Sequence, residues 1–260
     1  MQDSDLSLLI KAAKRAAEIA LPLCNGAAKS WDKDDGSGPV TEADLAVNDM
    51  LITLLRSERP DYGWLSEETE DHASRLDKRH CFVIDPIDGT RSFMNAESTW
   101  AHSFAIVTNG VPTAAVVYLP ALDHLYAAEI GQGATLNGES ITVSAQRKLE
   151  GASVLAARPA QSAKFWKNAR VPEFDRQHRP SLAYRLALVA QGQFDAMIIF
   201  RDSWEWDICA GALIASEAGG VVSDRLGAAL IFNQACPMTK GAIVAGPSLH
   251  RDIIALSDAN

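Results

Sequence analysis

The sequence predicts a layered sandwich of α-helices and β-sheets, an α/β (α+β) fold. Its first half mixes helical patterns with a signal for an antiparallel hairpin, and its second half alternates short strands with helices. A layered sandwich accommodates both halves better than a doubly wound parallel sheet. The 260 residues can bury a large core, so we expect one unit over 1–260, within which about 1–150 and about 151–260 could form two subdomains.

Three segments of the first half have clear structural patterns. Apolar residues recur at helical spacing over 6–20, which predicts a first helix that ends near Pro22. Thr41 precedes a second helical pattern with apolar residues over 45–55. The apolar run 81–84 stops abruptly at Asp85-Pro86, as a buried strand would. Two helices and a buried strand are therefore expected before residue 90.

A hairpin and a series of short elements complete the pattern. Asn109-Gly110 separates the apolar segments 103–107 and 114–118, and this dipeptide is a strong signal for a tight turn between antiparallel strands. Helices are expected at about 206–218, where Gly219-Gly220 forms a suitable C-cap, and at 248–257. Further strands are expected at 125–129, 153–157, 196–200, 221–222 and 242–245.

Charge and hydrophobicity exclude several classes of function. The formal net charge is −9 and no cluster of Lys and Arg is longer than two residues, which argues against nucleic acid as the main partner. No apolar run approaches the roughly 20 residues that span a bilayer, and residues 1–9 lack the basic region of a secretory signal. We therefore expect a cytoplasmic protein without a membrane partner. A small anionic substrate is compatible with this charge if a divalent metal is bound.

The four cysteines are widely spaced and form no metal-binding motif. Each has apolar neighbours in the sequence, so we expect small buried side chains rather than metal ligands or disulfide partners. They are Cys24, Cys81, Cys209 and Cys236.

The densest chemical signal is the segment 85–90, Asp-Pro-Ile-Asp-Gly-Thr. A strand delivers two carboxylates three residues apart, and with a backbone carbonyl they offer the oxygen ligands that hard divalent cations prefer. If Gly89 and Thr90 begin a helix, their N–H groups would also face an anion. Taken alone, the same segment fits a hydrogen-bonded Asp-Gly turn about equally well.

Other acidic residues could join this loop. Glu67 and Glu68 follow a strand or turn at 61–64. Asp207 stands at the start of the late helix, and Asp44 follows Thr41 in a pattern like a capping box. Alone, each fits an ordinary structural role, because adjacent glutamates are usually solvated and an Asp at a helix start usually caps it.

Together these segments resemble the inositol monophosphatase superfamily. Lys33 matches as well, eleven residues before Asp44. The similarity runs from about 33 to 220, and its motifs are Thr-Glu-Ala-Asp at 41–44, Ser-Glu-Glu-Thr at 66–69, the segment 85–90 and Trp-Asp-x-x-Ala-Gly at 206–211. The resemblance implies an alternating α/β/α/β/α sandwich, a Mg²⁺-dependent and lithium-sensitive phosphomonoesterase activity, a small phosphorylated substrate, and a homodimer.

The resemblance also implies a role for each matching residue. Two or three Mg²⁺ ions would be held by oxygen atoms of Glu67, Asp85, Ile87 through its backbone carbonyl, Asp88 and Asp207. Glu68 would orient these ligands or their waters. Asp44 would pair with the Thr90 hydroxyl to position and activate a water at the metal, and the N–H groups of Gly89 and Thr90 would bind phosphate oxygens.

The chain departs from the family pattern where a substrate would bind. Arg-Ser-Phe at 91–93 follows the Asp-Gly-Thr motif in place of Thr-Asn-Phe, and Pro-Ser at 180–181 stands where Gly-Ser often opens a helix. The acidic residue that contacts inositol in the animal enzymes falls on Phe200 here. The candidates for substrate specificity are Lys33, Arg91, Ser181, Arg201 and Glu205.

Hydrolysis of inositol 1-phosphate is the expectation for the broad class, and other substrates stay open. The alternatives are a 3′(2′),5′-bisphosphate nucleotidase and a histidinol-phosphate phosphatase, the latter because its relatives often have a similar Arg-small-Phe sequence. Fructose 1,6-bisphosphate stays open as well. An alternative of another class is a non-catalytic interaction protein on the same fold, for instance one that acts on the transcription machinery.

Trp204 and Trp206 flank Glu205 immediately before Asp207. We expect both rings to pack around the start of the helix, and the alternative is that Trp204 forms a wall of the substrate pocket.

Two other templates fail on spacing. The two aspartates of a haloacid-dehalogenase-type phosphatase are two residues apart, whereas Asp85 and Asp88 are three apart. An EF-hand counted from Asp32 would need Gly at position six and Glu at position twelve, but the chain has Gly at five and Ala43 at twelve.

Overall fold

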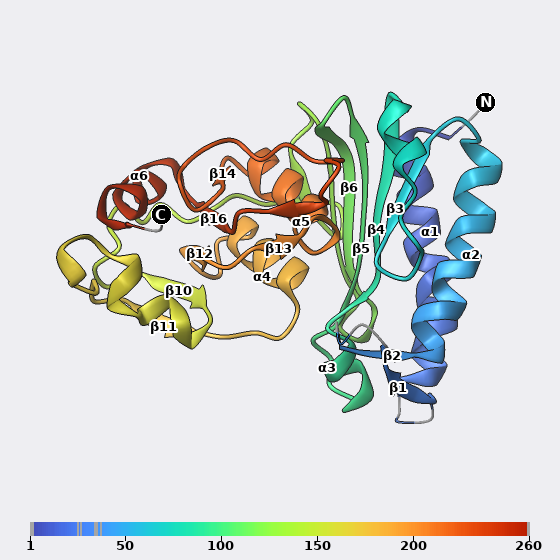
Figure 1. Ribbon diagram of the computed structural model, residues 1–260, viewed down its shortest axis with the longest axis horizontal. Helices are drawn as coiled ribbons and strands as arrows, with labels where there is room; N and C mark the ends of the chain where they lie inside the picture. The colour runs from blue at the N-terminus through green and yellow to red at the C-terminus, as the bar shows by residue number, and fades with distance from the viewer. Residues whose placement is uncertain (1–2, 25, 27, 34–35, 37, 259–260) are drawn as a thin grey trace.

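The computed structural model describes residues 3–24, 26, 28–33, 36 and 38–258, and it confirms the predicted α/β/α/β/α sandwich. Figure 1 shows α1 and α2 against one face of a seven-stranded sheet, α4 and α5 between that sheet and a five-stranded sheet, and α6 at the far end. Asp34 and Asp35, which belong to the EF-hand-like stretch, lie outside the described residues. Within the described part, no helix is long and apolar enough to cross a membrane.

The helices are α1 (Asp5–Ala20), α2 (Glu42–Glu58), α3 (Thr90–Met94), α4 (Leu182–Ala190), α5 (Glu205–Glu217) and α6 (Pro247–Leu256). The seven-stranded sheet contains, in spatial order, β3 (Gly63–Ser66), β4 (His80–Asp88), β5 (Ala101–Thr108), β6 (Val111–Leu119), β7 (His124–Glu129), β8 (Ala134–Leu136) and β9 (Glu139–Ser140). The five-stranded sheet contains β11 (Asp175–Gln177), β10 (Ser153–Ala156), β12 (Ala196–Ile199), β16 (Ala242–Ala245) and β14 (Val221–Ser223). Two small ladders join β1 (Ser30–Asp32) to β2 (Pro39–Thr41) and β13 (Ser203–Trp204) to β15 (Met238–Thr239).

The seven-stranded sheet is antiparallel except for the parallel pair β3 and β4. The predicted hairpin is confirmed, since β5 and β6 pair around Asn109 and Gly110. Both turn residues have positive φ, 50° and 85°, as a two-residue turn between twisted strands requires.

Alternating side chains of β4 face two different cores. Phe82 and Ile84 belong to the core with α1 and α2, whereas Cys81 and Val83 belong to the core with α4 and α5. Successive side chains of a strand point to opposite faces, and here both faces are buried. The run 81–84 is therefore continuously apolar instead of alternating.

The five-stranded sheet is also covered on both faces. Met197 of β12 and Val244 of β16 share the core of α4 and α5, and their neighbours Ile198 and Ile243 belong to an outer core with α6. The helices α4 and α5 thus form a middle layer that contacts both sheets (Figure 1). The division into two subdomains stays a prediction.

Two expectations need correction. Cys236 is exposed because it lies in the loop before β15, whereas Cys24, Cys81 and Cys209 are buried as expected. The strand expected to stop before Asp85 continues to Asp88, because its pairing with β5 resumes beyond an irregularity. Apart from β14, which was expected at 221–222, the strands of two or three residues were not predicted, since such short segments show no periodic pattern.

Helices α4 and α5 approach each other closely at Gly211. A Cβ atom at this position would lie only 2.4 Å from the Cβ of Leu186. No side chain fits at that distance, so glycine permits the approach. Ser181 caps the start of α4 and Asp207 lies in the first turn of α5, so this packing fixes two candidate site residues relative to each other.

We predict that Gly211→Ala lowers the free energy of unfolding by about 1–3 kcal/mol, as measured by urea denaturation. The clash with Leu186 should outweigh the gain of about 1 kcal/mol that alanine usually brings to a helix. Ser216→Ala, at an exposed position of the same helix, is the control and should be nearly neutral. Leu186→Ala should lower the free energy of unfolding less in the Gly211→Ala protein than in the wild type. If the effects of the two substitutions are additive, the close approach of Gly211 and Leu186 is contradicted.

Candidate active site

A β-bulge places Asp85 and Asp88 on the same face of the sheet. Residues three apart on a regular strand point to opposite faces. Here Asp85 pairs with Ser103 and Asp88 with Ala101, so two residues of β4 stand opposite the single His102 of β5. This extra residue restores the direction of the side chain. Both carboxylates consequently face the α5 side, where the Ser103 hydroxyl donates to the backbone carbonyl of Trp206 at 3.0 Å.

The sequence around Pro86 is compatible with a β-bulge at this position. Pro86 has no N–H to lose from the sheet, and its carbonyl accepts a hydrogen bond from Nδ1 of the buried His102 at 2.5 Å. Gly89 follows with φ of 94°, a left-handed conformation in which the chain turns from β4 into α3.

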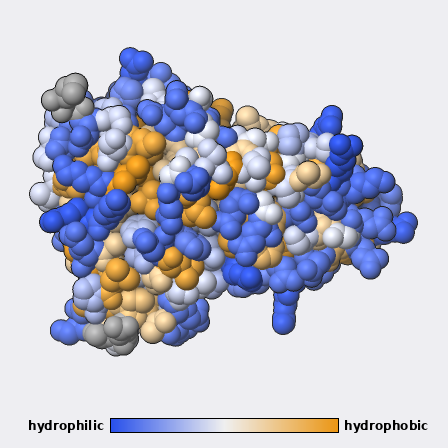
Figure 2. All heavy atoms as spheres, turned by 180° about the vertical axis from the view of Figure 1, so that it is seen from behind, coloured by the Kyte–Doolittle hydropathy of each residue, from blue (hydrophilic) through white to orange (hydrophobic). Residues whose placement is uncertain are grey.

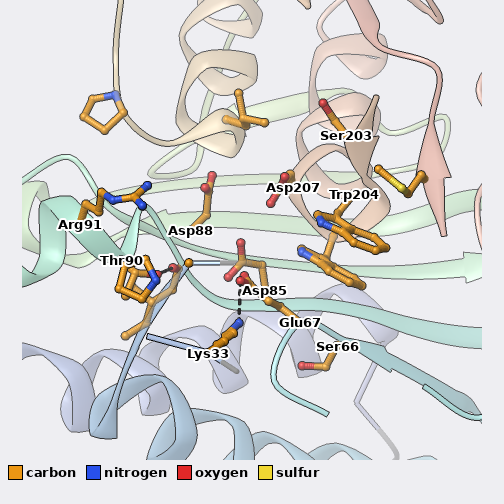
Figure 3. Close-up of a pocket in the computed structure, with 18 of the residues that line it drawn as sticks. Lys33, Ser66, Glu67, Asp85, Asp88, Thr90, Arg91, Ser203, Trp204 and Asp207 are labelled. Atoms are coloured by element: carbon orange, nitrogen blue, oxygen red, sulfur yellow. Dashed lines mark hydrogen bonds and ion pairs between the residues drawn. The ribbon is translucent and has the colours of Figure 1, made fainter. Parts of the chain in front are cut away.

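Three carboxylates from separate elements meet beside this bulge. Oxygen atoms of Glu67, Asp85 and Asp207 all lie within 4.8 Å of one another. Glu67 follows β3, Asp85 lies on β4, and Asp207 lies in the first turn of α5. Figure 3 shows the three side chains together, with Asp88 close by. Burial and the neighbouring carboxylates raise the pKa values of Asp85 and Asp207 well above the usual value.

The Asp85 carboxylate fits a bound cation. It is buried, and neither oxygen has a hydrogen-bond partner among the described residues. A buried, unpaired carboxylate is costly, and a cation bound by several oxygen atoms removes that cost. The donor set of carboxylate oxygens is the one that Mg²⁺ or Ca²⁺ prefers.

Asp88 is held from the other side by the start of α4. Its Oδ2 accepts hydrogen bonds from the Ser181 hydroxyl at 2.5 Å and from the backbone N–H of Ala183 at 2.6 Å. Burial raises the pKa of Asp88 to about 6, against the effect of these two bonds. Ser181 therefore orients an acidic residue, and it is not among the residues that line the cavity.

Lys33 offsets part of the negative charge. Its ammonium donates to Glu67 at 2.9 Å and to Glu68 at 2.7 Å. Burial alone would lower the pKa of Lys33, but the two glutamates raise it above its usual value. Burial also raises the pKa of Glu68 to about 7, although the bond from Lys33 opposes this shift.

Asp44 and Thr90 have other partners than the sequence led us to expect. The Asp44 carboxylate accepts from the backbone N–H and the hydroxyl of Thr41, which completes the capping box of α2. The Thr90 hydroxyl donates to the backbone carbonyl of Ile87 at 3.3 Å. The expected contact between Asp44 and Thr90 is not present among the described hydrogen bonds. Burial raises the pKa of Asp44 to about 6.

A cavity of about 890 Å³ surrounds the carboxylates. Among its lining residues are the predicted Lys33, Arg91 and Arg201, together with the backbone loop at 87–90. Glu205 is a correction, since it is fully buried and its carboxylate accepts the backbone N–H groups of Asn233 and Gln234. Its position at the start of α5 turns the side chain toward this loop, so a role in specificity by direct contact is wrong.

Sequence reasoning missed residues that position the site. Asn48 of α2 accepts from the Ser66 hydroxyl at 2.8 Å and donates to Thr69 at 3.0 Å, which ties down the turn with Glu67 and Glu68. Arg185 is buried in α4 and donates to the backbone carbonyls that precede Ser181. Arg185 is a charged residue in the otherwise apolar sequence of α4, and this could have indicated a positioning role. The sequence around Asn48 has no comparable feature.

The chain is similar to known proteins over its whole length. The whole chain, residues 1–260, matches the inositol monophosphatase family. An inositol-1-monophosphatase of Mesorhizobium japonicum is 32% identical over 219 residues, covering 80% of this chain and 77% of that protein. The Nus factor SuhB of Salmonella typhimurium is 32% identical over 275 aligned positions, covering 98% and 97%.

Solved structures agree with the fold as well. The extragenic suppressor protein SuhB of Bartonella henselae superimposes with a TM-score of 0.82 at 27% identity and 96% coverage of both chains. An IMPase of Thermotoga maritima gives 0.81 at 28% identity, covering 96% of this chain and 95% of that one. The chain belongs to the inositol monophosphatase family, which confirms the resemblance seen in its motifs.

We predict that Mg²⁺ raises the melting temperature and that the rise grows with pH. The pKa values of Asp85 and Asp88 in the folded protein are raised above the usual value of 3.8. Without metal, the free energy of unfolding should therefore fall as pH rises from about 4 through 6, the pKa of Asp88. Mg²⁺ requires the ionised carboxylates, so it should restore stability most above that range, by about 2.7 kcal/mol at 100-fold over its Kd. Differential scanning calorimetry in EDTA and in Mg²⁺ measures both effects.

Asp85→Asn should abolish this Mg²⁺ effect without lowering the stability of the metal-free protein, because it removes a buried charge and keeps the shape. The exposed Asp175→Asn is the matched control and should respond to Mg²⁺ as the wild type does. An undiminished Mg²⁺ response in Asp85→Asn would contradict the metal assignment.

Proposed function

We propose that the protein is a Mg²⁺-dependent hydrolase of a small phosphate monoester. The observation that carries the proposal is the meeting of Glu67, Asp85 and Asp207 within 4.8 Å inside a cavity that Arg91 and Arg201 also line. Clustered carboxylates repel one another, so such a cluster is useful when it holds cations. A phosphate group also needs positive charge in fixed positions for its slow hydrolysis.

The ions, two or three in number, would be held by Glu67, Asp85, the backbone carbonyl of Ile87, Asp88 and Asp207. Bound Mg²⁺ would lower the pKa of water and offset charge on the phosphoryl and leaving oxygens. The unpaired oxygens of Asp85 support this assignment.

The protein's own groups would orient the substrate and move protons. The N–H groups of Gly89 and Thr90 would bind phosphate oxygens at the turn after the bulge. Glu68 would keep Lys33 in place and so orient the ligands. Asp44 could accept a proton through the Thr90 hydroxyl only if its carboxylate gave up its hydrogen bond with the Thr41 hydroxyl and formed one with the Thr90 hydroxyl. Its pKa of about 6 suits a general base near neutral pH.

Inositol 1-phosphate is the first substrate to test, since relatives from two rhizobial species are named inositol-1-monophosphatases. The other candidates are 3′-phosphoadenosine 5′-phosphate, histidinol phosphate and fructose 1,6-bisphosphate. We propose a homodimer in the cytoplasm; hydrophobic side chains gather over the half of the molecule with the seven-stranded sheet, as Figure 2 shows, which supports contact with a second copy.

A second candidate function is an interaction with the transcription machinery, because relatives of equal identity are named Nus factor SuhB. The carboxylate cluster favours catalysis as the primary function, and the two functions are compatible on one chain.

Phosphate release from these four esters, with and without Mg²⁺ and Li⁺, tests the proposal. We predict Mg²⁺-dependent turnover of one ester well above the others, with inhibition by Li⁺. Release that is independent of metal, or none from any ester, would contradict the proposed activity.

Asp88→Asn should lower kcat roughly 100-fold or more, since one ligand charge is worth several kcal/mol of transition-state stabilisation. The asparagine oxygen can still accept from Ser181 and Ala183, and the buried charge is removed, so the melting temperature of the metal-free variant at neutral pH should be at least that of the wild type. Near-normal turnover by a folded Asp88→Asn protein would count against Asp88 as a ligand.

A further inference from the structure

One end of the cavity carries a stacked pair of tryptophans. The rings of Trp204 and Trp206 lie 4.7 Å apart with 10° between their planes, and both residues line the cavity. Trp206 packs against the core of α4 and α5, whereas Trp204 is 39% exposed. Figure 3 shows Trp204 on the same side of the cavity as Asp207 and Glu67. The stack therefore runs from the core outward and ends with an open ring of Trp204 at the cavity.

The backbone on both sides holds Trp204 in place. Trp204 pairs with Met238 in the ladder of β13 and β15, and the next backbone N–H, of Glu205, donates to the Pro237 carbonyl at 2.9 Å. The Glu205 carboxylate accepts two further backbone N–H groups of the same loop. The ring is thus pre-organised, and a ligand that binds it pays little entropy for ordering.

The surroundings of Trp204 favour a ring over a polyol. Pro237 and Met238 line the same end of the cavity, and they offer apolar and thioether surface. Hydroxyl groups placed over such a surface would lose water without gaining hydrogen bonds, which costs free energy. An aromatic ring loses little water at its faces and gains stacking.

The stack is close enough to the carboxylates for one small substrate to reach both. Trp204 precedes Asp207 by three residues, and three residues of extended chain span at most about 10 Å. This bound applies to the two Cα atoms; the side chains of Trp204 and Asp207 line the same cavity, so a phosphate ester with a ring in its alcohol can contact both.

We propose that Trp204 determines specificity by stacking on a planar aromatic ring in the leaving group of the phosphate ester. The proposal rests on the proposed function and deepens it. Among the candidate substrates, the purine of 3′-phosphoadenosine 5′-phosphate and the imidazole of histidinol phosphate supply such a ring. Inositol 1-phosphate and fructose 1,6-bisphosphate do not, so the wild type should favour one of the two aromatic esters.

Steady-state kinetics of Trp204→Ala and Trp204→Phe test the stacking. Loss of base stacking should raise the KM for the aromatic ester about 5- to 150-fold with kcat nearly unchanged. The KM for inositol 1-phosphate should not change, and phenylalanine should restore most of the affinity. The ester with the larger change identifies the purine or the imidazole. Equal KM changes for aromatic and polyol esters would overturn the proposal, because a merely structural role predicts them.

A binding measurement separates this proposal from the proposed function. Adenosine and histidinol carry the two rings without phosphate, so quenching of tryptophan fluorescence by them requires neither metal nor turnover. Saturable quenching should occur in the wild type and in Trp31→Phe, a control with 45% exposure outside the cavity lining, and be absent in Trp204→Ala. Quenching without turnover of any ester would overturn the hydrolase function and support the stacking subsite. No saturable quenching by either ring would overturn the subsite.

Discussion

The bulge at Pro86 and Ile87 is the constraint on which the rest of the site depends. It gives β4 one residue more than β5 over this stretch, and so directs Asp85 and Asp88 to the same side. That side faces α5, which brings Asp207, and lies next to the turn after β3, which brings Glu67. A regular strand with the same sequence would bury one of the two aspartates among the apolar side chains beneath α1 and α2.

The second requirement is to offset the negative charge of several carboxylates that are buried close together. The fold satisfies some of them by itself, through Lys33 at Glu67 and Glu68, and through Ser181 and the start of α4 at Asp88. Asp85, in the centre, receives nothing from the described residues. This difference between the carboxylates is informative. Those with hydrogen-bond partners in the protein help to position the site, whereas the carboxylate of Asp85, which lacks such a partner, indicates where a cation would bind.

The order of the motifs along the sequence predicted the family, the layers and the carboxylate cluster. Residues such as Asp85 and Asp207 lie in short motifs whose other residues form the end of a strand or the start of a helix, so the motif predicts the acidic residue and its element together. The capping box at Thr41 and the hairpin at Asn109 were also local enough to predict. The bulge and the anchoring of Glu205 by the loop at 233–234 were not, since both depend on partners distant in sequence. In this structure Asp44 pairs with Thr41, which is nearer in sequence and competes for the same carboxylate, so its pairing with Thr90 stays a prediction.

The middle layer has a consequence for variation among related chains. Glu67 and Asp207 reach the same point only because α5 is docked on the seven-stranded sheet, and Gly211 sets how closely α4 can support that docking. The geometry of the proposed cation site is therefore determined by the hydrophobic core as much as by the carboxylates themselves. Relatives with an identical set of carboxylates can consequently differ in the concentration of metal that they need, through substitutions that lie far from the cavity and carry no charge.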